Sequence, residues 1–410
     1  MDPQDHLLVF GASTRAAAFS ALRAGLRPWC GVLFNDADLI ARCPTVGVSR
    51  AEYPRRFLEV IRQAPTGSWL YTGGLENRRS LINRLAAIRP LWGNDSSVLA
   101  VVRSPHKIAA ILEQAGFFFP AIHFRPDEVP SSGAVAGGSG FNDIHFGPDD
   151  RPSSGRWLVK PCKSSGGSGI TFFLAREDKR LSTRRKRFFI QEYITGVSCA
   201  AAYLGDGQRA RLLGVTRQLI AESWLNARRF HYCGSVGPLP LSDNLRQTLE
   251  RLGDTVVAAS RMKGLFGIDF ILQEDIPWLV EINPRYTASM EVIEFGLNLP
   301  IMALHRRIFD SSAPTQTMPD NSFEPKWIGK AILFARDSVR FPGDGPWLAT
   351  LRNPSPITML PAFGDIPAPG QTIAKDCPIL TVFAKADSFN ICLDALQQKT
   401  RDLDHWLYER

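Results

Sequence analysis

The first hundred residues alternate apolar runs with segments of helical pattern. The apolar run Leu7–Phe10 predicts a strand, and the alanine-rich segment Arg15–Ala24 predicts a helix after it. A second strand is expected at Trp29–Phe34. The turn Gly11–Thr14 lacks the spacing G-x-G-x-x-G. The pattern therefore indicates a βαβ unit without a dinucleotide-binding fingerprint.

A glycine turn follows the apolar run Trp69–Tyr71. This turn, Thr72–Asn77, is expected at the carboxyl end of a strand, which is where open α/β sheets bind ligands. Glu76 and Asn77 are therefore candidates for substrate contact. Capping of a helix N-terminus explains the two residues equally well.

The middle of the chain contains a long segment without apolar periodicity. Residues 126–156 are rich in Pro, Gly, Ser and Asp, which predicts a long loop or an insertion. Before it, Pro105–Gln114 predicts a helix with proline in its first turn. After it, Arg156–Lys160 predicts a strand.

A loop of small residues, Ser164–Gly169, comes shortly after this strand. Its glycines allow backbone N–H groups to close over phosphate oxygens, and Lys160 would supply a point charge. The loop is not a Walker A motif, and a lone Gly/Ser loop is most often a hairpin connection. The next predicted strand, Phe188–Ile194, is apolar and carries Glu192 near its end.

Three oxygen donors are expected to converge further along the chain. Asp269 is flanked by apolar residues in one predicted strand, and Glu281 and Asn283 share one face of the next. These ligands suit a hard cation such as Mg²⁺, which would also relieve the repulsion between the two carboxylates. Arg285 adds a positive donor beside them. The alternative is an ordinary hairpin whose carboxylates face water.

Composition and charge limit the class of protein. With 410 residues, of which 44% are hydrophobic and 21% charged, the chain has room for two to four compact units. No apolar stretch is long enough to span a membrane, and the acidic start Met1–Asp5 leads directly into a strand, so we expect a cytoplasmic protein. The seven cysteines are scattered singly, which favours reduced thiols over disulfides or a zinc site.

The formal net charge of +8 comes partly from one basic run, Lys179–Arg187. The run lacks interleaved aromatic residues and precedes a strand directly. We therefore expect a solvated connector, and binding of nucleic acid is the less favoured alternative.

The order and spacing of these motifs resemble the ATP-grasp superfamily. The motifs are Lys160 with the Ser/Gly loop, Gln191–Ile194, Asp269 and Glu281–Arg285, and the similarity covers roughly residues 104 to 310. The preceding region resembles a pre-ATP-grasp domain. The segments Gly364–Gly370 and Pro378–Ala384 resemble the small β-rich domain of biotin-carboxylase-like members, and a helix packed on it is expected from Ser388 through Leu403.

The resemblance implies a fold of the classes α/β and α+β. It implies a Rossmann-like pre-ATP-grasp domain at 1–104, an ATP-grasp central lobe at 105–190, a C-terminal lobe with the metal site at 191–310, and an appended β-rich domain with a terminal helix at 311–410.

The resemblance also implies ATP and Mg²⁺ (or Mn²⁺) as cofactors, bound between the two lobes. The phosphates would be held by Lys107, Lys160, Ser164, Ser165, Gly166, Gly167, Ser168 and Gly169. The adenine would lie against the hinge strand, Gln191, Glu192, Tyr193 and Ile194, and the metal would be bound by Asp269, Glu281 and Asn283. Arg285 and Arg217 would steady the transferred phosphoryl group. Ser198 replaces an acid that binds ribose in many members, so the ribose contact is unassigned.

The implied activity is that of an ATP-dependent carbon–nitrogen ligase. It would activate a small-molecule carboxylate as an acylphosphate for attack by an amine. One alternative is an enzyme that forms carboxyphosphate from bicarbonate, and another is a protein that binds ATP without catalysis. Arg228–Ser235 mixes cations with aromatic residues, and could line a substrate pocket or belong to the core. Its Phe-x-Tyr-x-Gly pattern is similar to that of tyramine–glutamate ligase type enzymes of one-carbon cofactor pathways. A homodimer is the usual expectation for such enzymes.

Overall fold

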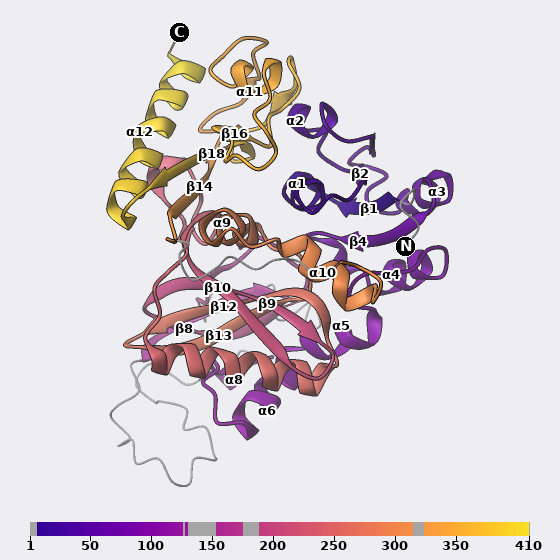
Figure 1. Cartoon of the computed structure of the whole chain (residues 1–410). Helices are drawn as coiled ribbons and strands as arrows, with labels where there is room; N and C mark the ends of the chain where they lie inside the picture. The colour runs from indigo at the N-terminus through magenta and orange to yellow at the C-terminus, as the bar shows by residue number, and fades with distance from the viewer. Residues whose placement is uncertain (1–5, 126–127, 130–152, 175–187, 315–323, 410) are drawn as a thin grey trace.

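The computed structural model describes residues 6–125, 128–129, 153–174, 188–314 and 324–409. Most of the loop expected at 126–156, and all of the basic run Lys179–Arg187, lie outside these ranges. The described strands form four sheets, and Figure 1 shows the first of them beside the large central sheet.

The first sheet is parallel, with strand order β3-β2-β1-β4. Its strands are β1 (His6–Gly11), β2 (Pro28–Val32), β3 (Thr45–Gly47) and β4 (Gly67–Tyr71), and the helices of this unit are α1 (Arg15–Arg23), α2 (Ala37–Ile40), α3 (Phe57–Gln63), α4 (Arg79–Ala86) and α5 (Ser96–Val102). Alternate residues of β1 enter two different cores, because both faces of the sheet are covered. This burial on both sides explains why β1 is a continuous apolar run. The strands and the helix predicted here are confirmed to within two residues.

A small antiparallel sheet follows, with strand order β5-β8-β6-β7. Its strands are β5 (Ile122–His123), β6 (Ser153–Pro161), β7 (Thr171–Phe172) and β8 (Phe188–Ile194), preceded by α6 (Pro105–Gln114). The predicted phosphate loop, Ser164–Gly169, connects β6 to β7 at the end of this sheet.

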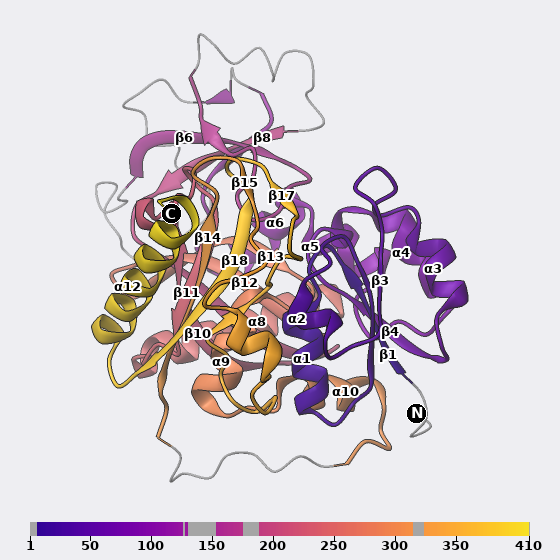
Figure 2. The ribbon, with the colours of Figure 1, turned by 90° about the horizontal axis from the view of Figure 1, so that it is seen from above.

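The central sheet is antiparallel and has eight strands in the order β13-β12-β9-β10-β11-β14-β18-β16. The strands are β9 (Val197–Asp206), β10 (Ala210–Ile220), β11 (Tyr232–Gly237), β12 (Lys263–Gln273), β13 (Ile276–Asn283), β14 (Trp327–Phe334), β16 (Phe363–Gly364) and β18 (Pro378–Ala386). Helices α8 (Asp243–Ser260) and α12 (Phe389–Tyr408) pack on it, as do α9 (Ala288–Leu297) and α10 (Ile301–Phe309). Figure 1 shows α9 and α10 between this sheet and the first unit, and Figure 2 shows the first unit to one side of the central sheet.

The predicted domain boundaries do not coincide with breaks in the sheets. Strand β8 runs across the boundary at 190/191, and the central sheet continues across 310/311 because β14, β18 and β16 extend it. The C-terminal stretch adds a two-stranded sheet of β15 (Val339–Arg340) and β17 (Thr372–Ile373) and the short helix α11 (Leu348–Arg352). The terminal helix packs on β14 and β18, as the apolar spacing predicted. In the described ranges, no helix has the length and apolarity needed to cross a bilayer.

Candidate active site

Asp269 and Glu281 are direct partners across two neighbouring strands. The register of β12 against β13 pairs Asp269 with Glu281 and Gly267 with Asn283. Residues opposite each other in a ladder share a face, so the three predicted donors converge. Asn283 Nδ2 donates to Asp269 Oδ2 at 2.9 Å. The convergence expected from the spacing is therefore present.

The electrostatics of this pair favour a bound cation. Burial and the neighbouring charge of Glu281 raise the pKa of Asp269 to about 7. Burial acts in the same direction on Glu281, but the positive charges of Arg103 and Lys160 outweigh it and lower the pKa of Glu281. In the described part of the chain, no three His, Cys, Asp or Glu side chains form a metal site by themselves. The two carboxylates and the Asn283 amide fit Mg²⁺ that takes further oxygens from phosphate or water.

Arg103, a cation outside the predicted motifs, lies against this pair. Arg103 Nη1 contacts Glu281 Oε1, and Arg103 Nη2 donates to Asn77 Oδ1 at 3.1 Å. The one signal for Arg103 in the sequence is its place just before the helix that carries Lys107. Lys107 itself is exposed on α6 and does not line the pocket described next.

One pocket joins the predicted phosphate loop to Glu281. Its polar lining includes Lys160, Gln191, Arg103, Ser164 and Glu281, and its apolar lining includes Val102, Ile108, Phe119, Phe189, Leu279 and Ile282. Lys160 is buried, and its Nζ donates to Gln191 Oε1 at 2.9 Å. Burial lowers the pKa of Lys160, and the carboxylates Glu281 and Asp269 oppose this shift. The apolar wall of the pocket suits the base of a nucleotide, and the cations at its other end suit the phosphate groups.

The predicted phosphate loop is held on two sides. Gly166, Gly167 and Gly169 have positive φ angles of 61°, 79° and 78°. A Cβ on Gly167 would lie 1.8 Å from the carbonyl oxygen of Phe230, so only glycine fits this close approach. Tyr232 N donates to the Gly166 carbonyl at 3.2 Å, and on the other side Asn77 Nδ2 donates to the Ser164 carbonyl at 3.3 Å. Within the loop, Ser168 N donates to the Ser165 carbonyl at 3.3 Å.

The side chains of the hinge strand that are predicted to bind adenine point to two different faces of the strand. Gln191 points into the pocket, whereas Glu192 Oε2 accepts a hydrogen bond from Ala121 N at 3.2 Å and so braces the chain at β5. The Tyr193 ring packs edge-on against Phe172, with the ring centroids 5.4 Å apart. Ile194 is buried. The roles proposed for Glu192, Tyr193 and Ile194 in adenine binding stay predictions.

Arg285 lies beside the predicted metal donors, but Arg217 does not. Arg285 Nε donates to Glu76 Oε1 at 2.9 Å, and its Nη2 donates to Asn283 Oδ1 at 3.1 Å. Arg217 lies over the ring of Phe389 in α12, with 5.2 Å from the guanidinium carbon to the ring centroid. The prediction that Arg217 contacts the phosphoryl group is therefore corrected.

Side chains alternate between the two faces of the sheet along β10. Gln218, the residue after Arg217, donates from Nε2 to Asp269 Oδ1 at 3.1 Å. Successive side chains of a strand point to opposite faces, so Arg217 faces α12 when Gln218 faces the carboxylates. Gln218 is thus the residue of β10 that contacts this site.

The aromatic segment after β10 lies against the predicted phosphate loop. The Phe230 ring packs edge-on against Phe172 at 5.3 Å, and Tyr232 Oη and Ser235 Oγ lie 2.9 Å apart. Neither aromatic ring belongs to the described hydrophobic cores, whereas Cys233 does. Of the two alternatives for this segment, a position at the edge of the site fits Phe230 and Tyr232 better than a position in the core.

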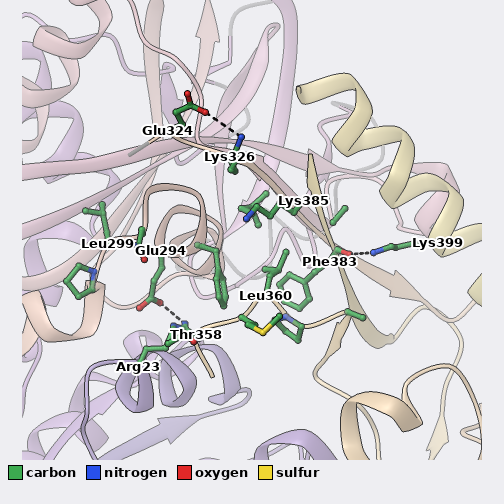
Figure 3. A pocket seen from close by; sticks show the side chains of 18 residues that line it. Arg23, Glu294, Leu299, Glu324, Lys326, Thr358, Leu360, Phe383, Lys385 and Lys399 are labelled. Carbon is green, nitrogen blue, oxygen red and sulfur yellow. Dashed lines mark hydrogen bonds and ion pairs between the residues drawn. The ribbon is translucent and has the colours of Figure 1, made fainter. Parts of the chain in front are cut away.

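A cavity of about 1110 Å³ lies elsewhere, between α1, the end of α9 and β18. Figure 3 shows the Arg23–Glu294 ion pair and the Lys399–Phe383 hydrogen bond at its walls. Its lining includes neither the glycine loop nor the carboxylate pair. It is therefore separate from the candidate site.

The comparisons with known sequences identify the central region. A sequence model of the ATP-grasp domain matches residues 148–289. An uncharacterized protein of Methanocaldococcus jannaschii is 28% identical over 231 residues, which cover 56% of this chain and 50% of that protein. The chain thus spans about half the length of this curated relative.

The comparisons with solved structures extend over nearly the whole chain. An L-amino acid ligase from Bacillus licheniformis has a TM-score of 0.66 at 15% identity, with 98% of both chains covered. A carboxyaminoimidazole ribonucleotide synthase from Aspergillus clavatus, complexed with ATP, has a TM-score of 0.66 at 14% identity, with 99% of this chain and 100% of that chain covered. A biotin carboxylase from Campylobacter jejuni has a TM-score of 0.61 at 13% identity, with 95% and 89% covered.

These matches confirm the resemblance expected from the motifs. Proteins of this fold have been solved with ATP and, in a biotin carboxylase domain of Hydrogenobacter thermophilus, with MgADP. The chain carries an ATP-grasp domain and has the multidomain fold of the ATP-grasp ligases.

Proposed function

We propose that this protein is an ATP-dependent ligase that activates a small-molecule carboxylate as an acylphosphate, which an amine then attacks to form a carbon–nitrogen bond. The proposal rests on one observation: Lys160, the glycine loop and the carboxylate Glu281 line a single pocket. ATP would supply the phosphoryl group, and Mg²⁺ would offset its negative charge.

The residues of the site would act by position and charge. Lys160, held by Gln191, and the backbone N–H groups of the loop would bind phosphate oxygens. Asp269, Glu281 and Asn283 would hold the cation. No protein nucleophile is required, because charge stabilisation and orientation are sufficient for phosphoryl transfer in line.

Arg285 would stabilise the charge that develops on the transferred group. Glu76 and Asn283 hold its guanidinium from two sides, so its position does not depend on a bound substrate. A preorganised cation of this kind is effective, because little reorganisation is needed during the reaction.

A screen over pairs of carboxylates and amines, with Mg²⁺ and ATP, tests this function. Amino acids come first in the panel, because an L-amino acid ligase shares the fold. We expect ADP and phosphate release that depends on both partners, formation of hydroxamate when hydroxylamine replaces the amine, and transfer of ¹⁸O from a labelled carboxylate to phosphate. The variant Arg56→Met, which changes an exposed ion pair, serves as the control.

Three outcomes would contradict the proposal. Release of AMP would indicate an adenylate instead of an acylphosphate. ADP release that needs bicarbonate and no amine would indicate carboxyphosphate formation. Tight ATP binding without turnover over the whole panel would indicate a nucleotide-binding protein that is not an enzyme.

A further inference from the structure

Arg103 lies where a cation and a nucleotide phosphate would meet. We propose that Arg103 is a counter-ion that Mg²⁺ displaces from Glu281 and that then binds the phosphate groups of the nucleotide, positioned by Asn77. This inference rests on the proposed function and adds a binding residue and a positioning residue to its site.

The contacts of Arg103 support the first part of this proposal. Its Nη1 contacts Glu281 Oε1, which is one of the oxygens that a divalent cation would take. Two positive charges compete for one carboxylate oxygen and repel each other at short range. Binding of Mg²⁺ at Asp269 and Glu281 therefore favours movement of the guanidinium away from Glu281.

Unused donor groups support the second part. Arg103 Nε and Gln191 Nε2 are buried and have no hydrogen-bond partner among the described residues. Both side chains line the same pocket as Lys160 and the phosphate loop. Buried donors are rarely left unpaired, so two of them in one pocket point to a ligand rich in acceptors. A planar guanidinium suits phosphate, because it can donate two parallel hydrogen bonds.

Asn77 connects this arginine to the loop that covers the phosphates. Its Oδ1 accepts from Arg103 Nη2 at 3.1 Å, and its Nδ2 donates to the Ser164 carbonyl at 3.3 Å. Asn77 belongs to η1 (Leu75–Asn77) of the first unit. One amide therefore fixes the relative positions of Arg103 and the phosphate loop.

Two binding measurements on the full chain separate this role from a structural one. Mn²⁺ binding without nucleotide is measured by electron paramagnetic resonance at pH 8, and ATP binding with Mg²⁺ by calorimetry. For Arg103→Met we expect tighter Mn²⁺ binding, because the competing cation is gone, and about tenfold weaker ATP binding from the loss of charge-assisted hydrogen bonds. Adenosine binding, which involves no phosphate, should stay unchanged.

The matched variants isolate the guanidinium and its support. Arg103→Lys keeps the charge and lacks the planar fork, so Mn²⁺ binding should stay near that of the wild type while ATP binding weakens. Asn77→Ala should weaken ATP binding, and it should bind Mn²⁺ at least as tightly as the wild type does. Arg56→Met should change neither, since its ion pair with Glu52 is exposed.

Some results would overturn the inference. Weaker binding of both Mn²⁺ and ATP in Arg103→Met would mean that Arg103 only supports the structure, and unchanged ATP binding would mean that it does not contact phosphate. If Arg103→Met fails to fold, unchanged ATP binding in Arg103→Lys contradicts the proposal by itself. Failure of the wild-type protein to bind ATP would instead contradict the proposed function.

Discussion

Arg15 donates to both carboxylate oxygens of Glu291, at 2.7 and 2.8 Å, although the two residues lie 276 positions apart in the chain. Both side chains are buried. Lys330 Nζ also donates to Glu291, at 2.7 Å, and Arg15 Nε donates to Asp365 at 3.0 Å. The network joins α1 of the first unit to α9 and to the C-terminal strands.

Removal of Arg15 should strongly destabilise the protein. In Arg15→Met, Glu291 and Asp365 lose a buried counter-ion, and breaking a buried pair in this way costs roughly 3–5 kcal/mol. Urea unfolding followed by circular dichroism measures the loss. Arg56→Met, which breaks an exposed pair, should change the free energy of unfolding by less than about 1 kcal/mol. Equal losses in the two variants would show that the buried network does not hold the units together.

Glu281→Ala should keep the fold and lose turnover. The substitution removes one of the two carboxylates proposed to hold Mg²⁺, and loss of one preorganised charge contact lowers kcat by about 100-fold or more. ADP release measures the rate, and near-ultraviolet circular dichroism checks the fold. Full activity in this variant would contradict the metal site.

Gly167→Ala should impair the phosphate loop more than Gly166→Ala. Both glycines have positive φ, so both variants carry backbone strain, but nothing lies within 4 Å of a Cβ on Gly166, whereas a Cβ on Gly167 meets the Phe230 carbonyl oxygen at 1.8 Å. The added clash displaces the loop. We expect the KM for ATP to rise about tenfold more in Gly167→Ala, which corresponds to about 1.4 kcal/mol. Similar values in the two variants would mean that the close approach to Phe230 does not position the loop.

His305 should make the protein less stable in mild acid. The ring is buried, Nδ1 accepts from Leu265 N at 3.0 Å, and Nε2 lies 3.2 Å from the Trp92 carbonyl oxygen. Burial lowers the pKa of His305 to about 4, below its ordinary value. The unfolded chain therefore binds the proton more readily than the folded chain does between these two pKa values.

The sign of the effect follows from this difference. The free energy of unfolding has its full value above about pH 6.5. As the pH decreases toward 4, protonation of His305 in the unfolded chain lowers this free energy by up to about 3 kcal/mol. His305→Gln keeps an acceptor and a donor but does not titrate in this range. Its free energy of unfolding should therefore depend less steeply on pH, and parallel curves for the variant and the wild type would contradict this assignment.

The local elements and the order of the motifs could be predicted from the amino-acid sequence alone. Apolar periodicity predicted β1, α1, α6, β8 and α12, because the period of a strand or helix depends only on neighbouring residues. The spacing of Asp269, Glu281 and Asn283 predicted their convergence, because these residues lie on two consecutive strands. The resemblance to ATP-grasp proteins followed from the same motifs.

Which distant residues complete the site depends on how the chain packs in three dimensions. The register of β10 against its neighbours directs Gln218, and not Arg217, toward Asp269. The packing of the first unit on the central sheet brings Glu76 to Arg285 and Arg103 to Glu281. Such contacts depend on strand register and on the docking of units that lie far apart in the chain. The periodicity of apolar residues along the sequence predicts neither of these.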